Sequence, residues 1–267
     1  MSADPTRFAG DWLALRAPAD AAARDPALLR AARAHLAAQP AALAVDLGAG
    51  SGATVAAVGA AGIRWRLLDQ DAGLLARARA RFGTGIETRV TDITDIAALP
   101  LGEARLVTAS ALLDLMTARW AGALAERLAV DGCGLYAALS YDGHMAFTPA
   151  LEGDAAMLAA FNGHQRGDKG EGPALGPDAA PVLAQALARR GFAVRTAPSP
   201  WRLGPDAARL QQEFIAGIAA AVGPAADPWA QARCAMVAGA TCVVGHVDLL
   251  ALPPTRSQSK TTSVPSP

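Results

Sequence analysis

Short apolar runs alternate with segments of helical periodicity from about residue 42 onward. The apolar runs occupy 43–47, 65–68, 86–90, 104–109, 134–139, 192–196 and 241–249. Helical segments lie between most of them, at 53–61, 73–81, 117–129 and 178–189. Strands that alternate with helices form mainly parallel sheets that are covered on both faces. The pattern therefore predicts an α/β fold, a doubly wound and mainly parallel sheet of seven strands.

Further helical segments flank this alternating region. Asp25 followed by Pro26 is typical of a helix start, with Asp as the N-cap and Pro in the first turn. An earlier helix is expected at 11–15, ending before Pro18. Two segments that begin at prolines, 205–222 and 228–238, predict a helical insertion before the last strand.

These segments divide the chain into three parts. We expect an N-terminal helical cap at 1–40 and the α/β domain at 41–252. Residues 253–267 are polar and rich in Pro, Ser and Thr. Such a segment buries too little apolar surface to fold, so it is predicted to be a disordered tail.

Composition narrows the classes of partner. The chain has 24 basic and 24 acidic residues, without the basic excess of a nucleic-acid binder or of a protein held on an anionic membrane. No apolar run reaches the length of a transmembrane helix. The three cysteines form no close pair and the four histidines show no ligand spacing, which predicts reduced thiols, no metal site and a cytoplasmic location. Nothing in the sequence predicts the oligomeric state.

The strongest motif is a glycine-rich turn that closes the first strand and opens a helix. It reads Asp46-Leu47-Gly48-Ala49-Gly50-Ser51-Gly52. Glycines permit a tight turn and let a ligand approach the backbone, where the N–H groups of the new helix face it. Asp69 stands about 20 residues later, at the end of the second strand, where a carboxylate accepts hydrogen bonds from ribose hydroxyls. The spacing is neither that of a dinucleotide fingerprint nor that of a P-loop.

This motif resembles the first motif of the class I, Rossmann-like S-adenosylmethionine-dependent methyltransferases. The resemblance covers about residues 42–139 and extends more loosely to the seventh strand. It implies S-adenosyl-L-methionine as the cofactor and Asp69 as the ribose-binding acid, with Asp92 and Ile93 near the adenine and Ser110 near the methyl-bearing end. Arg16 or Arg24 of the helical cap is a weaker candidate for the methionine carboxylate. The cofactor-binding residues implied in this way are Asp46, Gly48, Ala49, Gly50, Gly52, Asp69, Gln70, Asp92, Ile93 and Ser110.

The residues after the fourth strand bear on the acceptor. Family members that methylate base amino groups or protein glutamine carry a proline-rich motif there, whereas this chain has Ser110-Ala111-Leu112-Leu113-Asp114. It also lacks the Pro-Cys nucleophile of cytosine methylation. We therefore expect methyl transfer to the oxygen, nitrogen or carbon of a small-molecule metabolite, with the acceptor atom left open.

Hydrogen-bonding and charged side chains crowd into 140–172, between glycines. This segment is either a loop over the cofactor or a solvated surface loop. His164 is the first candidate for a general base, because histidine titrates near neutral pH, and Tyr141 and His144 are rivals. Only two lysines occur, Lys169 and Lys260, and the second falls in the tail. The substrate-binding candidates are Lys169, Arg166 and Asp114.

Two other functions stay open. A nicotinamide-dependent oxidoreductase also uses a glycine turn, although the Tyr-x-x-x-Lys pair of the short-chain enzymes is missing here. A non-catalytic binding protein with the same fold is the second alternative. An enzyme that uses the cofactor for another group transfer is also compatible with the sequence.

Overall fold

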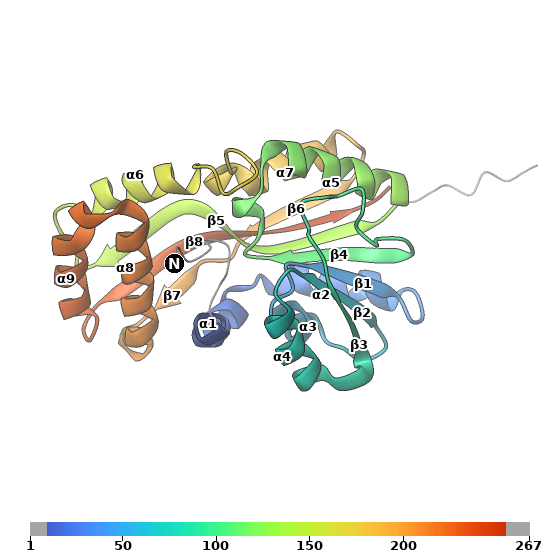
Figure 1. The fold of residues 1–267 in the computed structure, drawn as a ribbon, viewed down its shortest axis with the longest axis horizontal. Helices are drawn as coiled ribbons and strands as arrows, with labels where there is room; N and C mark the ends of the chain where they lie inside the picture. Colours follow the sequence, from blue (N-terminus) through green and yellow to red (C-terminus); the bar gives the residue numbers. More distant parts are fainter. Residues whose placement is uncertain (1–9, 255–267) are drawn as a thin grey trace, which may run out of the picture.

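Eight strands form one sheet in the part of the chain that the computed structural model describes, residues 10–254 (Figure 1). Their order is β3-β2-β1-β4-β5-β8-β6, and β7 pairs with β8 outside this path. Strands β3, β2, β1, β4 and β5 pair in parallel, whereas β8 is antiparallel to each of its partners. The strands are β1 (Leu43–Leu47), β2 (Arg64–Asp69), β3 (Ile86–Val90), β4 (Ala104–Ser110), β5 (Gly134–Thr148), β6 (Ala193–Pro198), β7 (Trp201–Leu203) and β8 (Thr241–Leu252).

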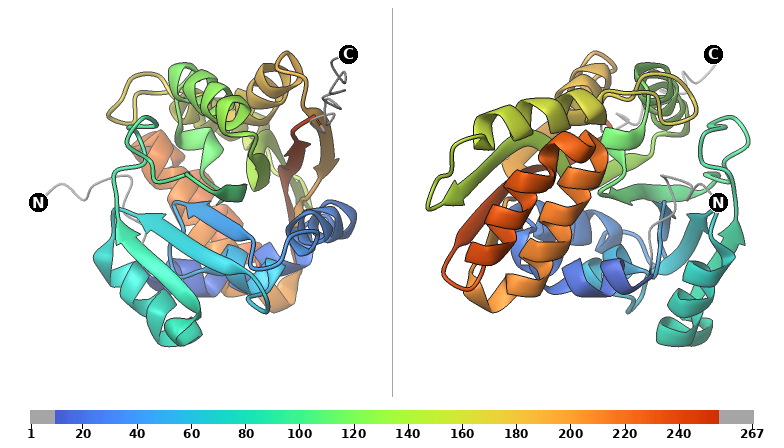
Figure 2. Two further views of the ribbon diagram at one scale, coloured as in Figure 1. Left: turned by 90° about the vertical axis from the view of Figure 1, so that its right-hand side faces the viewer. Right: turned by 60° about the vertical axis from the view of Figure 1, so that its left-hand side comes forward.

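Helices cover both faces of this sheet (Figures 1 and 2). In Figure 1, α5, α6 and α7 lie above the sheet, α1 to α4 lie below it, and α8 and α9 pack at the end where β5 and β8 extend furthest. The helices are α1 (Gly10–Ala23), α2 (Pro26–Ala37), α3 (Ala53–Val58), α4 (Ala72–Phe82), α5 (Ala118–Asp131), α6 (Asp154–Gln165), α7 (Ala179–Ala188), α8 (Ala208–Val222) and α9 (Asp227–Met236). The expected N-cap is confirmed at Asp25, whose side chain accepts a hydrogen bond from Leu28 N.

The doubly wound, mainly parallel sheet, the helical cap and the helical insertion are confirmed, but the count of seven strands is wrong. The extra strand is β7, which has only three residues and carries an arginine, Arg202, at its centre. A segment that short shows no apolar run in the sequence. The predicted tail at 253–267 lies outside the described residues, apart from its first two prolines.

Two further local predictions are wrong. Residues 140–148 were expected in a loop, but they continue β5, because β8 is long enough to pair with them as far as Thr241. The first helix does not end before Pro18; α1 continues to Ala23. An ion pair between Arg16 and Asp20, one turn apart, spans this proline and holds the two halves of the helix together.

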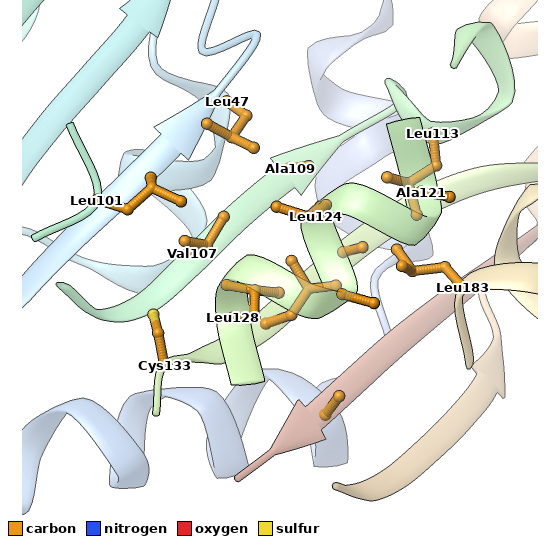
Figure 3. Close-up of a cluster of buried hydrophobic side chains, with 14 of the residues drawn as sticks. Leu47, Leu101, Val107, Ala109, Leu113, Ala121, Leu124, Leu128, Cys133 and Leu183 are labelled. Atoms are coloured by element: carbon orange, nitrogen blue, oxygen red, sulfur yellow. The ribbon is translucent and has the colours of Figure 1, made fainter. Parts of the chain in front are cut away.

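The main hydrophobic core lies between the sheet and the helices α5 and α7 (Figure 3). Leu124 and Leu128 of α5 and Leu183 of α7 meet Leu47 and Val107 of the central strands there. A second core on the opposite face is centred on Leu28, Trp65 and Tyr136. A third, rich in aromatic residues, joins α1, α6, α8 and α9 to the extended ends of β5 and β8. Among the described helices, none is both long and apolar enough to cross a membrane.

A buried carboxylate, Asp248 of β8, joins three parts of the fold. Its Oδ1 accepts a hydrogen bond from Leu139 N at 2.9 Å, at a bulge in β5 where Leu139 adopts φ = 57°. Its Oδ2 accepts from Asp25 N at 2.9 Å and from the Tyr136 hydroxyl at 3.3 Å. The start of α2 and the bulge of β5 are therefore fixed to the same residue.

We expect Asp248→Ala to lower the free energy of unfolding by about 3 kcal/mol or more, because it leaves buried donors without an acceptor. Asp248→Asn keeps one acceptor oxygen and should lose less. Urea unfolding followed by tryptophan fluorescence measures both, with the exposed Glu126→Ala on α5 as the control. An Asp248→Ala protein as stable as the control would contradict this role.

Candidate functional site

A cavity of about 1620 Å³ opens at the carboxyl edge of the parallel strands. The turn after β1 and the ends of β2, β3 and β4 form its floor, and α1 and residues 169–172 complete its walls. In parallel α/β sheets this edge is where ligands bind. Most of the expected cofactor residues line it: Gly48, Ala49, Gly50, Asp69, Gln70, Asp92, Ile93 and Ser110.

The glycine turn connects β1 to α3 and needs its glycines. Gly48, Gly50 and Gly52 all adopt positive φ, at 61°, 52° and 84°. A Cβ at Gly52 would lie 2.6 Å from Phe82 Cε2, so Gly52 is required by packing although it does not line the cavity. A Cβ at Gly50 would lie 3.4 Å from Leu13 Cδ1, which shows how closely α1 lies over the turn.

Asp69 holds this turn in place. Its Oδ2 accepts a hydrogen bond from Gly50 N, and its Oδ1 accepts one from Asp71 N, both at 2.8 Å. Each carboxylate oxygen has more than one lone pair, so both retain accepting capacity toward the cavity. Asp71 caps α4, accepting from Gly73 N and Leu74 N, as its position in the sequence predicts.

The far end of the cavity, after β3, combines an acid with an apolar wall. Asp92 Oδ1 accepts from the backbone N and the hydroxyl of Thr94. Ile93 lines the cavity beside Trp120, whose Nε1 donates to Ile93 O at 2.7 Å. Trp120 was not singled out from the sequence, because an apolar residue in the first turn of a helix carries no sign of its neighbours.

Two buried charged groups, Arg24 and Asp46, lie in and beside the cavity wall. Arg24 lines it and donates through Nη2 to Ser110 Oγ at 2.8 Å. Asp46 lies in β1, 1% exposed and outside the cavity lining, and accepts from the Thr108 hydroxyl at 2.6 Å. Within the described residues, Arg24 Nη1 and Asp46 Oδ2 are buried without a hydrogen-bond partner. Burial raises the pKa of Asp46 to about 7, although Thr108 and Arg24 oppose this shift.

The three candidate bases lie outside the cavity lining. The Tyr141 hydroxyl donates to Asn162 Oδ1 at 2.8 Å, and burial raises its pKa. His144 is 85% exposed and contacts Asp142 at the surface. His164 lies near the end of α6, with Nδ1 3.4 Å from Lys169 Nζ. Their part in catalysis stays a prediction.

The loop after α6 brings Lys169 into the cavity wall. Asp168 Oδ1 accepts from Gly170 N and Gly172 N, which folds the loop back on itself. Leu175 N donates to Met116 O at 2.8 Å and ties the loop to the segment after β4. Arg166, the other basic candidate of this loop, instead pairs with Asp178 at the surface.

Asp114 belongs to a short 3-10 helix, η2 (Leu113–Leu115), that follows β4. Its side chain is not in the cavity lining, but Leu112 and Leu115 on either side of it are. Its Oδ1 is buried and has no hydrogen-bond partner among the described residues. Burial raises the pKa of Asp114 to about 6, against the opposing charges of Arg16 and Lys169.

Comparison with known proteins identifies the fold. No protein-family model matches the chain, and no curated protein matches its sequence. The YcgJ protein of Bacillus subtilis is 10% identical at a TM-score of 0.53, over 86% of this chain and 99% of that one. The cyclopropane synthase MmaA2 of Mycobacterium tuberculosis is 13% identical at 0.50, over 84% and 83%. An S-adenosylmethionine-dependent methyltransferase of Geobacter sulfurreducens, in complex with S-adenosyl-L-homocysteine, is 14% identical at 0.46, over 86% and 92%.

The fold expected from the sequence is confirmed: a mainly parallel, Rossmann-like α/β sheet. Likeness at this identity establishes the fold, and the activity has to be argued from the site.

We expect Gly52→Ala to destabilise the protein by about 1–3 kcal/mol more than Gly59→Ala. Both glycines flank α3 at positive φ, but a Cβ at Gly59 meets nothing within 4 Å. Removing the clashing ring with Phe82→Ala should recover part of the loss, and thermal unfolding of the single and double variants tests this. Equal losses in the two glycine variants would show that Phe82 does not restrict the turn.

Asp46 should make stability depend on pH. Its folded pKa of about 7 lies above its unfolded value, so its stabilising contribution is full below about pH 4 and is lost as pH rises toward 7. The neutral Asp46→Asn should therefore gain stability over the wild type with rising pH. At about 1.4 kcal/mol per pH unit the difference approaches 4 kcal/mol. Urea unfolding between pH 4 and pH 8 measures it, with Glu126→Gln as the control, and parallel wild-type and Asp46→Asn curves would contradict the assignment.

Proposed function

We propose that the chain is an S-adenosyl-L-methionine-dependent methyltransferase that acts on a small-molecule metabolite. The observation that carries this proposal is the pair of buried, unpartnered charged atoms, Arg24 Nη1 and Asp46 Oδ2, near the glycine turn. Buried polar atoms without a hydrogen-bond partner are costly, so two of opposite charge in and beside a cavity wall favour a ligand that carries both signs of charge.

The residues present fit that cofactor along its length. Arg24 suits the methionine carboxylate. The carboxylate of Asp46, close to the glycine turn, suits the ammonium group of the methionine. Asp69, fixed at the end of β2, suits the ribose hydroxyls. Asp92, Ile93 and Trp120 offer a carboxylate and an apolar wall to the adenine. The glycine turn lets the ligand approach the backbone.

When bound, the cofactor supplies a sulfonium methyl group, which is a strong electrophile. The protein then has to hold the acceptor in line and to exclude water. The wall formed by α1 and residues 169–172 serves the second task, since both segments contribute to the cavity lining. Among the candidate bases, His164 is the one that contacts a cavity residue, Lys169.

The size of the cavity favours an enzyme with two ligands over a non-catalytic binding protein. Ligand sites of 300–1,000 Å³ suffice for one drug-sized molecule, and about 1620 Å³ leaves room for an acceptor beside the cofactor. A non-catalytic binding protein needs no second compartment. The balanced charge favours a small acceptor over nucleic acid. A cytoplasmic location remains part of the proposal, in keeping with three cysteines that form no disulfide.

We expect S-adenosyl-L-methionine and S-adenosyl-L-homocysteine to bind, and Asp69→Ala to weaken both by about 2–3 kcal/mol, roughly 30- to 150-fold. Arg24→Met should weaken both by about 1.5–3 kcal/mol through loss of a charge-assisted hydrogen bond. Isothermal titration calorimetry measures these affinities.

The control is Arg30→Met, which removes an exposed arginine from α2, the helix that follows Arg24. NADH serves as the competing cofactor class. Unchanged affinities in Asp69→Ala and Arg24→Met, or tight binding of NADH, would refute the cofactor assignment.

A further inference from the structure

The cavity is also lined by residues that follow Ser110, the last cofactor-binding residue expected from the sequence. Leu112, Leu115 and Met116 line it from the segment after β4, and Lys169 lines it from the opposite loop. The two segments are joined by Leu175 N donating to Met116 O. This region is called the distal subsite below; Asp114 lies beside it, between the lining residues Leu112 and Leu115.

Asp114 is the first of its two charged groups. Its Oδ1 is buried, and no donor in the described part of the chain reaches it. Three groups lie close enough for electrostatic interaction with Asp114. The charges of Arg16 and Lys169 oppose the rise in the pKa of Asp114, and the charge of Asp114 helps to raise the pKa of Tyr141. None of them donates to Oδ1, so a donor from a ligand would complete its hydrogen bonding.

Lys169 is the second charged group of the distal subsite. Its ammonium donates to His164 O at 3.1 Å and lies 3.4 Å from His164 Nδ1, which leaves at least one of its three donors for a ligand. Among residues 10–254 no carboxylate lies within ion-pair distance of it. A compact ammonium in a partly buried wall suits a carboxylate or a phosphate.

The neighbouring cation is already paired. Arg16 Nε and Nη2 donate to the two oxygens of Asp20, and Asp20 Oδ1 also accepts from Trp201 Nε1 at 2.9 Å. The guanidinium further stacks over the Trp201 ring. Lys169, rather than Arg16, is therefore the cation left for a ligand.

Resting on the methyltransferase proposal above, we infer that Asp114 and Lys169 hold the methyl acceptor, which carries a hydroxyl or amine that donates to Asp114 and an anionic group that pairs with Lys169. The apolar side chains of Leu112, Leu115 and Met116 contact the body between these groups. The acceptor class is thus a small hydroxy or amino acid, or the corresponding phosphate.

Ligand-observed NMR on protein saturated with S-adenosyl-L-homocysteine tests this without turnover. The probes are a panel of hydroxy- and amino-carboxylates and their phosphate counterparts, each with its neutral amide or alcohol and its O- or N-methylated form. We expect members of the anionic, protic set to bind at least tenfold more tightly than both matched forms. The carboxylates and the phosphates are compared as two separate sets, which shows which anion the site binds.

The variants assign each preference to one residue. Lys169→Met should abolish the preference for the anion, Lys169→Arg should keep it, and Asp114→Asn should remove the discrimination against methylated forms. Asp227→Asn and Arg190→Met, both exposed and outside the cavity lining, are the controls. Urea unfolding and retained S-adenosyl-L-homocysteine binding establish that each variant is folded.

Two failures are distinguishable. Wild-type protein that binds no S-adenosyl-L-homocysteine would refute the proposed function. Protein that binds it, but binds no probe of the panel, or binds probes regardless of charge or equally well in all variants, would refute the acceptor assignment alone.

Discussion

The arrangement of the site depends on the buried carboxylate of Asp248. Strand β8 runs antiparallel to its neighbours, so it places this residue against the middle of β5. There the carboxylate accepts hydrogen bonds from the bulge at Leu139 and from the N-terminus of α2. Because Arg24 directly precedes that N-terminus, the same contact sets where its guanidinium enters the cavity and reaches Ser110. An interaction on the last strand therefore orders residues at the start of the chain.

The bulge belongs to a wider pattern of backbone strain at this edge of the sheet. Ala111 adopts φ = 49° directly after β4, and its N–H donates to Ala138 O, next to the bulge. Non-glycine residues at positive φ are uncommon and persist where the surroundings hold them. The turn at Ala111 directs the following segment, with Leu112 and Leu115, along the cavity. Backbone strain therefore occurs next to residues that line the cavity.

The sequence predicts local features well and distant pairings poorly. The glycine turn, Asp69 and the N-caps at Asp25 and Asp71 each follow from a few adjacent residues, and the structure places them as expected. The extension of β5 requires pairing with a strand about 100 residues away, and its polar residues resemble a loop when read alone. For the same reason Trp120, Arg24 and Lys169 meet at one cavity without any shared sequence pattern. The contribution of a side chain to a site depends on which strands become neighbours.

The distribution of unsatisfied groups argues that this cavity is a binding site and not a packing defect. Among the described residues, the buried side-chain atoms without partners that belong to arginine or aspartate are those of Arg24, Asp46 and Asp114. All three lie in or directly beside the residues that line one cavity, whereas the unpartnered serine, glutamine and histidine atoms belong to other parts of the chain. A buried atom of a charged group without a hydrogen-bond partner costs more than a buried hydroxyl without one. Concentrating the costly ones at a preformed cavity preorganises it for a ligand with complementary charges, which is how a protein reduces the reorganisation that binding requires.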